Sequence, residues 1–402
     1  MFKINKNSVI VFLTLIALSS LGYFLAGKEE IKNSKKEFEV SLIQGYLGTQ
    51  LDSSGRIEND ILESDEENFK LDYTFDDKLS NYVEKRLRYY RPDRAAVVVM
   101  DSVNGDILTS VGFDRKTKSF DNLLPFTGTH PSASLFKIIT SAELLEDGEV
   151  DGDTKFNYRG RGTTLYRYQL KNKKSRWTRS SSFERAFAFS NNVIFGKAAI
   201  QNTTPFELKE MAERFGFNKS IMQEIDMAKS TFLVPKEGYN LAEIASGFNK
   251  KTMMSPVHCA ALSSVVANNG EMVSPRLVKS VKDSKGNVVW NNEVEKFPVL
   301  GEKAVGELKD LMQATVKMGT ARKHFRRMRR KVKNSLDIGG KTGSITGGFP
   351  FGKRDWFTSF AIPKDQSSNP ISVCVMIINY EKWYVRSAKL AQEIIQYYYT
   401  KK

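Results

Sequence analysis

Ser134-Leu-Phe-Lys137 opens an apolar segment that continues to Leu145 and stops at Gly148. Apolar side chains fall on nearly every face of this segment, which predicts a helix buried at the centre of a domain. Ser134 and Lys137 are three residues apart, so a helix carries both side chains on one face. A lysine in a buried helix needs a partner, because an isolated ammonium group is costly to remove from water.

Two further short motifs, Ser190-Asn-Asn and Lys341-Thr-Gly, complete a set of groups for acyl transfer. Serine is a poor nucleophile until a base removes its proton, and a lysine does this when burial and a second cation lower its pKa. We predict Ser134 as the nucleophile and Lys137 as its base, with Lys341 as the second cation. Ser190 is predicted to pass a proton between Lys137 and the leaving amine. Singly, each motif also fits an ordinary helix start, polar turn or strand end.

Polar groups of the same motifs are predicted to hold the substrate. Asn192 is expected to bind a substrate amide, and Thr342 a substrate carboxylate. Gly343 lacks a side chain and would let the substrate backbone lie close to the strand. The backbone N–H groups of Ser134 and Ser344 are predicted to form an oxyanion hole.

Histidine, metal and cofactor chemistry find no support in the sequence. A Ser-His-Asp hydrolase needs a placed histidine, but no Gly-x-Ser-x-Gly elbow occurs, and His130, His258 and His324 lack metal-ligand spacing. We therefore predict no metal and no cofactor. Cys259 and Cys374 each lie in an apolar stretch and are expected to be buried free thiols, although an oxidising compartment would allow a disulfide.

An apolar run from Val9 to Ala26, preceded by Lys3 and Lys6, dominates the N-terminal region. The run approaches the ~20 residues that cross a bilayer, and the two lysines orient the rest of the chain outward. We predict a single-pass membrane anchor over residues 1–27, and a cleaved signal peptide is the alternative. In either case the catalytic part is expected outside the cytoplasm, in the periplasmic space.

The net charge of the chain is strongly basic, at +15 over 402 residues. This favours a protein that works near anionic lipid or cell-wall polymer over a nucleic-acid-binding protein, because no nucleic-acid-binding motif occurs. Residues 28–85 are polar and mixed in charge, which predicts a stalk. Residues 86–402 are predicted to form one catalytic domain. The basic stretch from Arg322 to Lys333 fits either a docking patch for an anionic or protein partner or a solvated loop.

Strand patterns occur at both ends of the predicted catalytic domain, and helical patterns lie between them. Asn104-Gly105 is a strong hairpin signal between two strands. A sheet built from distant segments, with helices inserted, predicts the α+β class. The expected strands cover residues 95–100, 106–110, 338–344, 356–362 and 371–378. The expected helices cover residues 79–87, 134–147, 207–215, 257–268 and 387–399, and a capping box at 181–184 precedes another helix.

Taken together, the three motifs resemble those of penicillin-binding-protein transpeptidase domains, and the likeness runs from about Ala95 to Tyr397. The segment that ends at Lys137 resembles the family's Pro-Gly-Ser-x-x-Lys sequence, although Ser132-Ala133 stands in place of Pro-Gly. The other similar stretches are Ala267-Asn-Asn-Gly270, Gly319-Thr-Ala321 and Asp355-Trp-Phe357.

This resemblance implies an antiparallel sheet flanked by helices, beside an all-helical lobe, with the site between them. It also implies a D,D-transpeptidase in which Ser134 attacks the penultimate D-Ala of a peptidoglycan stem peptide, and in which β-lactams acylate the same serine. A D,D-carboxypeptidase and a class D-like serine β-lactamase stay open as alternatives, although class D enzymes usually carry a hydrophobic residue where this chain has Asn192. A non-catalytic cell-wall scaffold is a further alternative.

Overall fold

The computed structural model of the chain describes residues 40–53, 57, 59–64 and 67–401. The predicted membrane anchor over residues 1–27 lies outside these ranges. Within the described ranges, no helix is both long enough and apolar enough to cross a bilayer. The anchor therefore stays a prediction.

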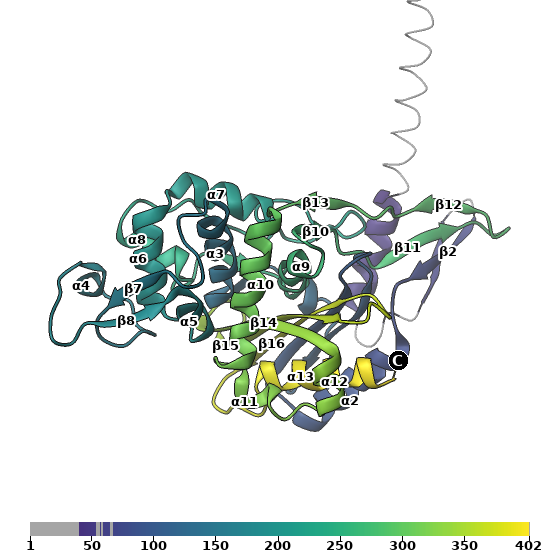
Figure 1. Ribbon diagram of the computed structural model, residues 1–402. Helices are drawn as coiled ribbons and strands as arrows, with labels where there is room; N and C mark the ends of the chain where they lie inside the picture. Colours follow the sequence, from purple (N-terminus) through teal and green to yellow (C-terminus); the bar gives the residue numbers. More distant parts are fainter. Residues whose placement is uncertain (1–39, 54–56, 58, 65–66, 402) are drawn as a thin grey trace, which may run out of the picture.

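A six-stranded antiparallel sheet forms the centre of the molecule (Figure 1). Its order is β14-β15-β16-β3-β4-β5, so strands from the two ends of the sequence lie side by side, with Val98 of β3 opposite Cys374 of β16. The α+β class and the five expected strands are thereby confirmed. The strands are β3 (Arg94–Asp101), β4 (Ile107–Asp114), β5 (Ser119–Phe120), β14 (Leu336–Gly347), β15 (Gly352–Pro363) and β16 (Ile371–Asn379).

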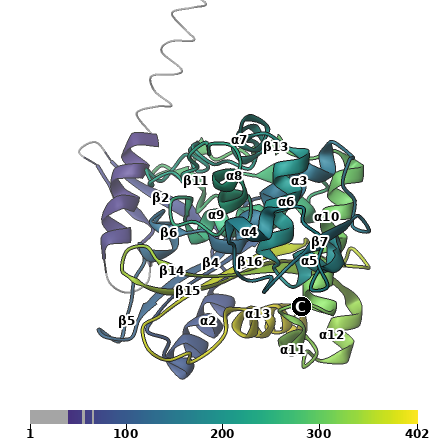
Figure 2. The same ribbon diagram turned by 90° about the vertical axis from the view of Figure 1, so that its left-hand side faces the viewer.

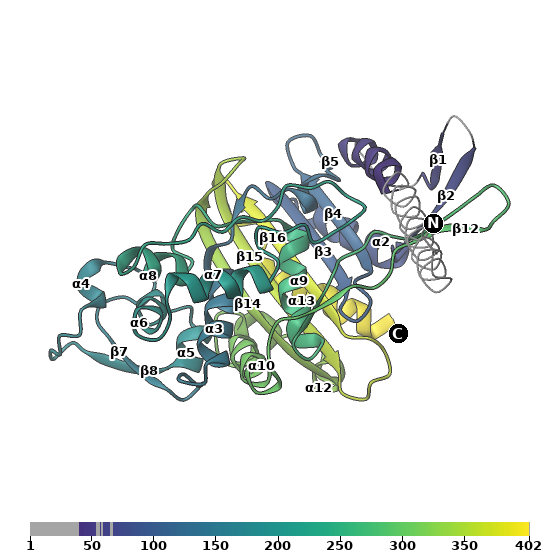
Figure 3. The same ribbon diagram turned by 90° about the horizontal axis from the view of Figure 1, so that it is seen from above.

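Helices cover both faces of this sheet, which is why β16 is buried along its whole length (Figures 1 and 3). Successive residues of a strand point to opposite faces. Val98 accordingly joins the core that includes α9 and α10, and Val97 joins the core that includes α2 and α13. These helices are α2 (Asp77–Tyr90), α9 (Pro256–Ala267), α10 (Glu302–Lys317) and α13 (Ser387–Lys401).

A helical lobe lies at one end of the sheet, and Figure 2 views the molecule from that end. An arm made of β7, α4 and β8 extends from the lobe. Ser182 caps α5 by accepting a hydrogen bond from the Arg185 backbone N–H, so the predicted cap at Ser181 is displaced by one residue. The lobe contains α3 (Lys137–Glu146), α5 (Phe183–Ala188), α6 (Asn192–Asn202), α7 (Pro205–Arg214) and α8 (Tyr239–Ala245), and its arm contains β7 (Lys155–Tyr158), α4 (Arg167–Leu170) and β8 (Arg179–Ser182).

Short elements connect these parts. β6 pairs with β9 beside the nucleophile segment, and β10 pairs with β13. Their bounds are η1 (Leu124–Phe126), β6 (His130–Pro131), η2 (Ala133–Phe136), β9 (Met253–Met254), β10 (Glu271–Val273) and β13 (Lys296–Pro298).

The described part of residues 28–85 belongs to the folded body, where we expected a polar stalk. Residues 40–52 form a helix that buries Ile43, Leu47 and Leu51 in the main core. These three side chains recur every four residues, which is the stripe of an amphipathic helix. Further along, a second sheet has the order β1-β2-β11-β12 and joins this segment to the rest of the chain. Its strands are β1 (Ile61–Glu63), β2 (Asn68–Tyr73), β11 (Val278–Lys282) and β12 (Val288–Asn291).

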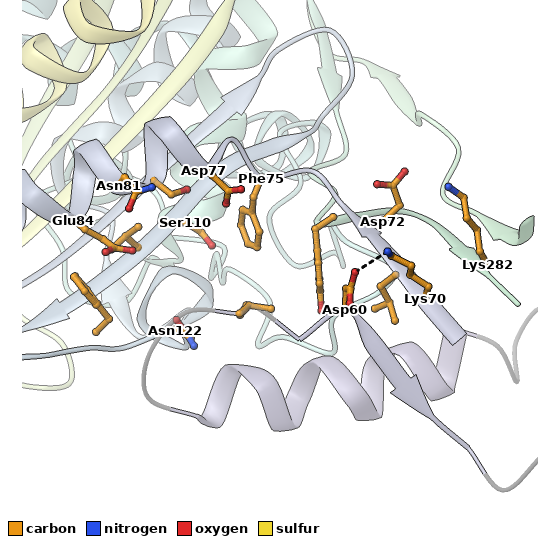
Figure 4. A pocket seen from close by; sticks show the side chains of 16 residues that line it. Asp60, Lys70, Asp72, Phe75, Asp77, Asn81, Glu84, Ser110, Asn122 and Lys282 are labelled. Atoms are coloured by element: carbon orange, nitrogen blue, oxygen red, sulfur yellow. Dashed lines mark ion pairs between the residues drawn. The ribbon is translucent and has the colours of Figure 1, made fainter. Parts of the chain in front are cut away.

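A cavity of about 580 Å³ lies where this segment meets α2 and β4 (Figure 4). Its lining is polar and includes the carboxyl groups of Asp60, Asp77 and Glu84. Lys70 forms an ion pair with Asp60 at 3.5 Å across the mouth of the β1–β2 hairpin. None of the residues that line this cavity belongs to the three sequence motifs.

A disulfide joins Cys259 of α9 to Cys374 of β16, with 5.7 Å between the two Cα atoms. Both side chains are fully buried, as the sequence predicted, but the expectation of free thiols is wrong. The two cysteines are 115 residues apart in the sequence, and only the packing of α9 on the sheet brings them together.

Replacing both cysteines by alanine should lower the free energy of unfolding by about 2–5 kcal/mol, because the bridge restricts a long loop of the unfolded chain. Urea denaturation of the oxidised protein and of the Cys259→Ala/Cys374→Ala variant measures this difference. Equal stability of the two proteins, together with two titratable thiols in the unreduced parent, would contradict the bridge.

The basic stretch between β14 and α10 forms two short helices, α11 (Arg322–Phe325) and α12 (Arg330–Ser335), which contact α13. Phe325 and Val332 are buried in the core on that side of the sheet. The stretch is therefore anchored by its apolar side chains and is not a solvated loop. A docking role for its exposed lysines and arginines stays a prediction.

Candidate active site

The nucleophile segment begins with a tight turn, where we expected an α-helix. Ser134 lies in the 3₁₀-helix η2, and α3 begins at Lys137. Side chains three residues apart in a 3₁₀-helix lie directly above one another, so the turn aligns Ser134 with Lys137. Ala133 precedes them at φ 52°, a left-handed conformation that glycine adopts freely and that costs alanine roughly 1–2 kcal/mol. The departure from the family's Pro-Gly therefore places strain beside the nucleophile.

Lys137 is fully buried and contacts three oxygen atoms. Its Nζ lies 2.9 Å from Ser134 Oγ and 2.7 Å from Asn192 Oδ1, and it also donates to the Ser246 carbonyl. Burial, and then repulsion by Lys341, hold the pKa of Lys137 well below its usual range. A neutral amine has two N–H donors and one lone pair, so it can donate to Asn192 and Ser246 while it accepts the Ser134 proton. This arrangement suits a general base.

Ser190 and Lys341 form the second half of the site. Ser190 follows α5 at φ 57°, and its Oγ accepts a hydrogen bond from Lys341 Nζ at 3.0 Å. Lys341 also donates to the Thr342 carbonyl at 3.0 Å. Burial lowers the pKa of Lys341 to about 7. Near neutral pH this lysine is therefore divided between its charged and neutral forms, and its neutral form can take part in proton transfer through Ser190.

Asn192 orients the base in this structure. α6 begins at this residue, and its backbone N–H donates to the Gly162 carbonyl at 2.7 Å. The side-chain Nδ2 donates to the Thr163 carbonyl at 3.0 Å, while Oδ1 accepts from Lys137. Both ends of the amide are thus engaged by the protein. The contact between Asn192 and a substrate amide stays a prediction, and it requires one of these bonds to be shared or released.

β14 brings the third motif against the nucleophile turn. A Cβ on Gly343 would lie 3.3 Å from the Cβ of Ala133, so the strand and the turn are in close contact. Thr342 Oγ1 lies 2.6 Å from Thr320 Oγ1, and Ser344 is exposed on the strand. These positions place all three motifs in one site. The substrate contacts and the oxyanion hole that we expect there stay predictions.

Two residues that the sequence analysis missed, Ser246 and Gly247, complete the support of the nucleophile. Ser246 supplies the third oxygen to Lys137. Gly247 has φ 65°, and a Cβ there would overlap the Ala133 carbonyl and lie 3.0 Å from Ser134 N. A glycine after α8 looks like an ordinary helix stop in the sequence, and no motif marks either residue.

The buried histidines have structural surroundings. His130 Nδ1 lies 3.2 Å from Arg354, and burial followed by that cation lowers the pKa of His130 to about 3. His258 Nε2 lies 2.6 Å from the Phe215 carbonyl, and burial lowers the pKa of His258 to about 4. Both rings are therefore neutral at pH 7. No group of three His, Cys, Asp or Glu side chains that could hold a metal ion occurs in the part of the chain that the structure describes.

Residues 95–396 match the family described as the penicillin binding protein transpeptidase domain. Among curated proteins, penicillin-binding protein 2A of Bacillus subtilis is 26% identical over 311 residues, which cover 66% of this chain and 42% of that protein. Stage V sporulation protein D of the same organism is 23% identical over 299 residues, which cover 67% and 43%. The chain thus spans less than half the length of these relatives.

Solved structures share the fold. The D,D-transpeptidase domain of a peptidoglycan glycosyltransferase from Eggerthella lenta has a TM-score of 0.66 and 21% identity, over 83% of this chain and 84% of that one. Penicillin-binding protein A from Mycobacterium tuberculosis, solved as an imipenem acyl-enzyme complex, has a TM-score of 0.62 and 19% identity, over 82% and 79%. The family match over residues 95–396 covers more than half of this chain. The chain therefore belongs to the penicillin-binding-protein transpeptidase domain family.

Proposed function

We propose that this protein is a serine D,D-transpeptidase that cross-links peptidoglycan stem peptides. The observation that carries the proposal is the 2.9 Å separation between Ser134 Oγ and the Nζ of Lys137, a buried lysine with a lowered pKa. Serine becomes an effective nucleophile when such a base is in contact with its hydroxyl. The family to which the chain belongs supplies the substrate class.

Acylation follows from this geometry in two proton transfers. Ser134 Oγ attacks the carbonyl carbon of the penultimate D-Ala while Lys137 Nζ takes the hydroxyl proton. The tetrahedral intermediate collapses when its C–N bond breaks and the departing D-Ala nitrogen receives a proton. Ser190 Oγ is the donor that we assign. Its hydrogen-bond partner is Lys341 Nζ at 3.0 Å, so we assign its reprotonation to Lys341 in place of Lys137, which we expected from the sequence. The product is an ester between Ser134 and the stem peptide.

Deacylation uses the same groups in reverse. The amine of a neighbouring stem attacks the ester carbonyl and loses a proton to Ser190 and, through it, to Lys341. Lys137 returns the proton that it took during acylation to the Ser134 oxygen, which leaves as a hydroxyl. A new amide then links the two stems. Water in place of the amine would give a carboxypeptidase. A β-lactam would acylate Ser134 by opening its ring. Penicillin-binding protein A from Mycobacterium tuberculosis has been solved as such an acyl-enzyme complex, with imipenem.

Labelling with fluorescent penicillin tests the proposal, with Ser134→Ala as the matched variant. We expect a stable label on the parent protein and none on the variant. A synthetic donor ending in D-Ala-D-Ala, supplied with an amine acceptor, should then give a cross-linked product. Release of D-Ala without cross-linking would assign a carboxypeptidase, and rapid drug turnover would assign a β-lactamase. A folded protein that is never acylated would instead support the alternative of a non-catalytic cell-wall scaffold.

We further infer that residues 1–27 anchor the protein in the cytoplasmic membrane, with the catalytic domain outside the cytoplasm. Lys3 and Lys6 before the apolar run from Val9 to Ala26 support this orientation. Accessibility of an engineered surface cysteine to a membrane-impermeant thiol reagent in intact cells would test it, and protection of that cysteine would overturn it.

A further inference from the structure

The arm formed by β7, α4 and β8 is the most uniformly basic part of the lobe, and it lies at the left edge of the molecule in Figure 1. Residues 154–183 contain nine lysines and arginines and no aspartate or glutamate. None of these nine side chains forms an ion pair with a carboxylate among the residues that the structure describes. The arm therefore carries a concentrated positive charge that the protein itself does not neutralise.

Five cations converge on one cavity of about 200 Å³ at the base of the arm. Three of them, Lys171, Lys173 and Lys174, are exposed and follow α4. The other two come from the fold beneath, Arg159 from the end of β7 and Lys197 from α6. No carboxylate lines the cavity. Like charges held this close repel one another, and a bound anion would relieve that repulsion.

The two deeper cations, Lys197 and Arg159, have fewer hydrogen-bond acceptors around them than they have N–H donors, within the part of the chain that the structure describes. Lys197 is only 6% exposed, and its Nζ donates to the Asn157 carbonyl at 2.9 Å. Burial, and then Arg159, lower the pKa of Lys197. Arg159 donates from Nη2 to the Tyr168 carbonyl at 2.8 Å, but its Nε is buried without a hydrogen-bond partner among the described residues. A buried charged donor without a partner is costly, and an anion bound in the cavity would supply the acceptor that Arg159 Nε lacks.

We propose that this cavity is a binding site for a phosphate-type oxyanion, and, resting on the proposed function, that this oxyanion belongs to a wall polymer. A phosphate group offers several acceptor oxygens and delocalised negative charge, which suits a guanidinium and several ammonium groups arranged around a small volume. The hydroxyl of Thr178 also lines the cavity and can donate to such an oxygen. Each phosphodiester of a polymer carries one negative charge, so successive phosphates of one strand would together balance several of the five cations.

The cavity is connected to the catalytic site through a short and well-fixed loop. Gln169 is buried, and its Nε2 donates to the carbonyls of Arg159 and Arg161 at 3.0 and 3.2 Å. The next residues along this loop, Gly162 and Thr163, accept the two hydrogen bonds from Asn192. An anion at Arg159 is thus bound on the loop that orients Asn192. The site would hold a phosphate-bearing strand beside the acylation site without taking part in acylation.

Binding of an oligo(glycerol phosphate) to the full-length protein tests this site, with poly-L-glutamate of equal charge as the carboxylate probe. The variant K171Q/K173Q/K174Q removes the exposed cations of the cavity. Its matched control, K116Q/K285Q/K303Q, removes three exposed lysines from outside the arm. We expect the first variant to bind oligo(glycerol phosphate) at least about tenfold more weakly than the parent, and the second to change little. Fluorescent penicillin labelling should be unchanged in both, because none of the six lysines lies in the catalytic site.

Three outcomes would overturn the proposal. The parent protein could fail to bind the phosphate oligomer at 50 mM salt, where such contacts are strong. The two triple variants could lose affinity equally, which would assign the binding to net charge alone. Poly-L-glutamate could bind as tightly as the phosphate oligomer and depend equally on the three arm lysines, which would assign a general polyanion surface. Inorganic phosphate that competes with the oligomer only in the parent would support a phosphate site.

Discussion

Lys137→Met should reduce the rate of Ser134 acylation by on the order of 10³-fold, because methionine keeps the length and apolar stem of the side chain but cannot accept a proton. In the structure, Lys137 Nζ is the group 2.9 Å from the Ser134 hydroxyl, and no histidine takes its place among the described residues. The second-order rate constant for penicillin acylation measures the effect. A thermal unfolding curve close to that of the parent would show that the loss is chemical.

Lys137→Arg is the control that separates charge from proton transfer. A guanidinium keeps a positive charge in the same place but does not lose its proton at accessible pH, so the arginine variant should be as slow as the methionine variant. In the parent protein the rate should fall as the pH falls through the lowered pKa of Lys137, since only the neutral amine takes the proton. An arginine variant that acylates at the parental rate would show that Lys137 supplies charge and is not the base.

Gly247→Ala should reduce the rate of Ser134 acylation by at least about 10²-fold, although Gly247 has no side chain that could take part in the reaction. Gly247 has φ 65°, and an added Cβ would overlap the Ala133 carbonyl at the start of the nucleophile turn. The Ala133 carbonyl belongs to the backbone and cannot rotate away from the new Cβ, so η2 must shift and carry Ser134 with it. A displacement of about 1 Å between reacting groups is enough to cost this much in rate. The penicillin acylation rate again provides the measurement.

Gly148→Ala is the matched control for the backbone penalty. Gly148 also has a positive φ, 75°, but a Cβ there would meet nothing within 4 Å. The Gly148→Ala substitution should therefore lower the free energy of unfolding by about 1 kcal/mol, as alanine does in a left-handed position, and leave the acylation rate unchanged. Equal acylation rates in the two glycine variants would show that the contact between Gly247 and Ala133 does not position the nucleophile.

The elements of the sheet were predictable because their signals are local. The apolar run of β16 and the hairpin signal at Asn104-Gly105 depend only on neighbouring residues. The segment before α2 was misjudged for the opposite reason. Its polar residues of mixed charge dominate the local composition, whereas the role of Ile43, Leu47 and Leu51 is set by the core on which they pack. The disulfide was missed on the same ground, since its cysteines meet only across the interface between α9 and β16.

The sequence by itself determined the chemical groups of the site: Ser134, Lys137, Ser190 and Lys341 stand in three motifs whose residue types are those of acyl transfer. Only the tertiary structure decided how these groups act on one another. It brings Lys341 to Ser190 across 151 residues and places the Ser246 carbonyl on Lys137 across 109. The lowered pKa values follow from that burial, because removal from water and the approach of a like charge are properties of the packed core. A side chain's identity is local, but its environment is made by segments far away in the chain, and no pattern of neighbouring residues encodes those contacts.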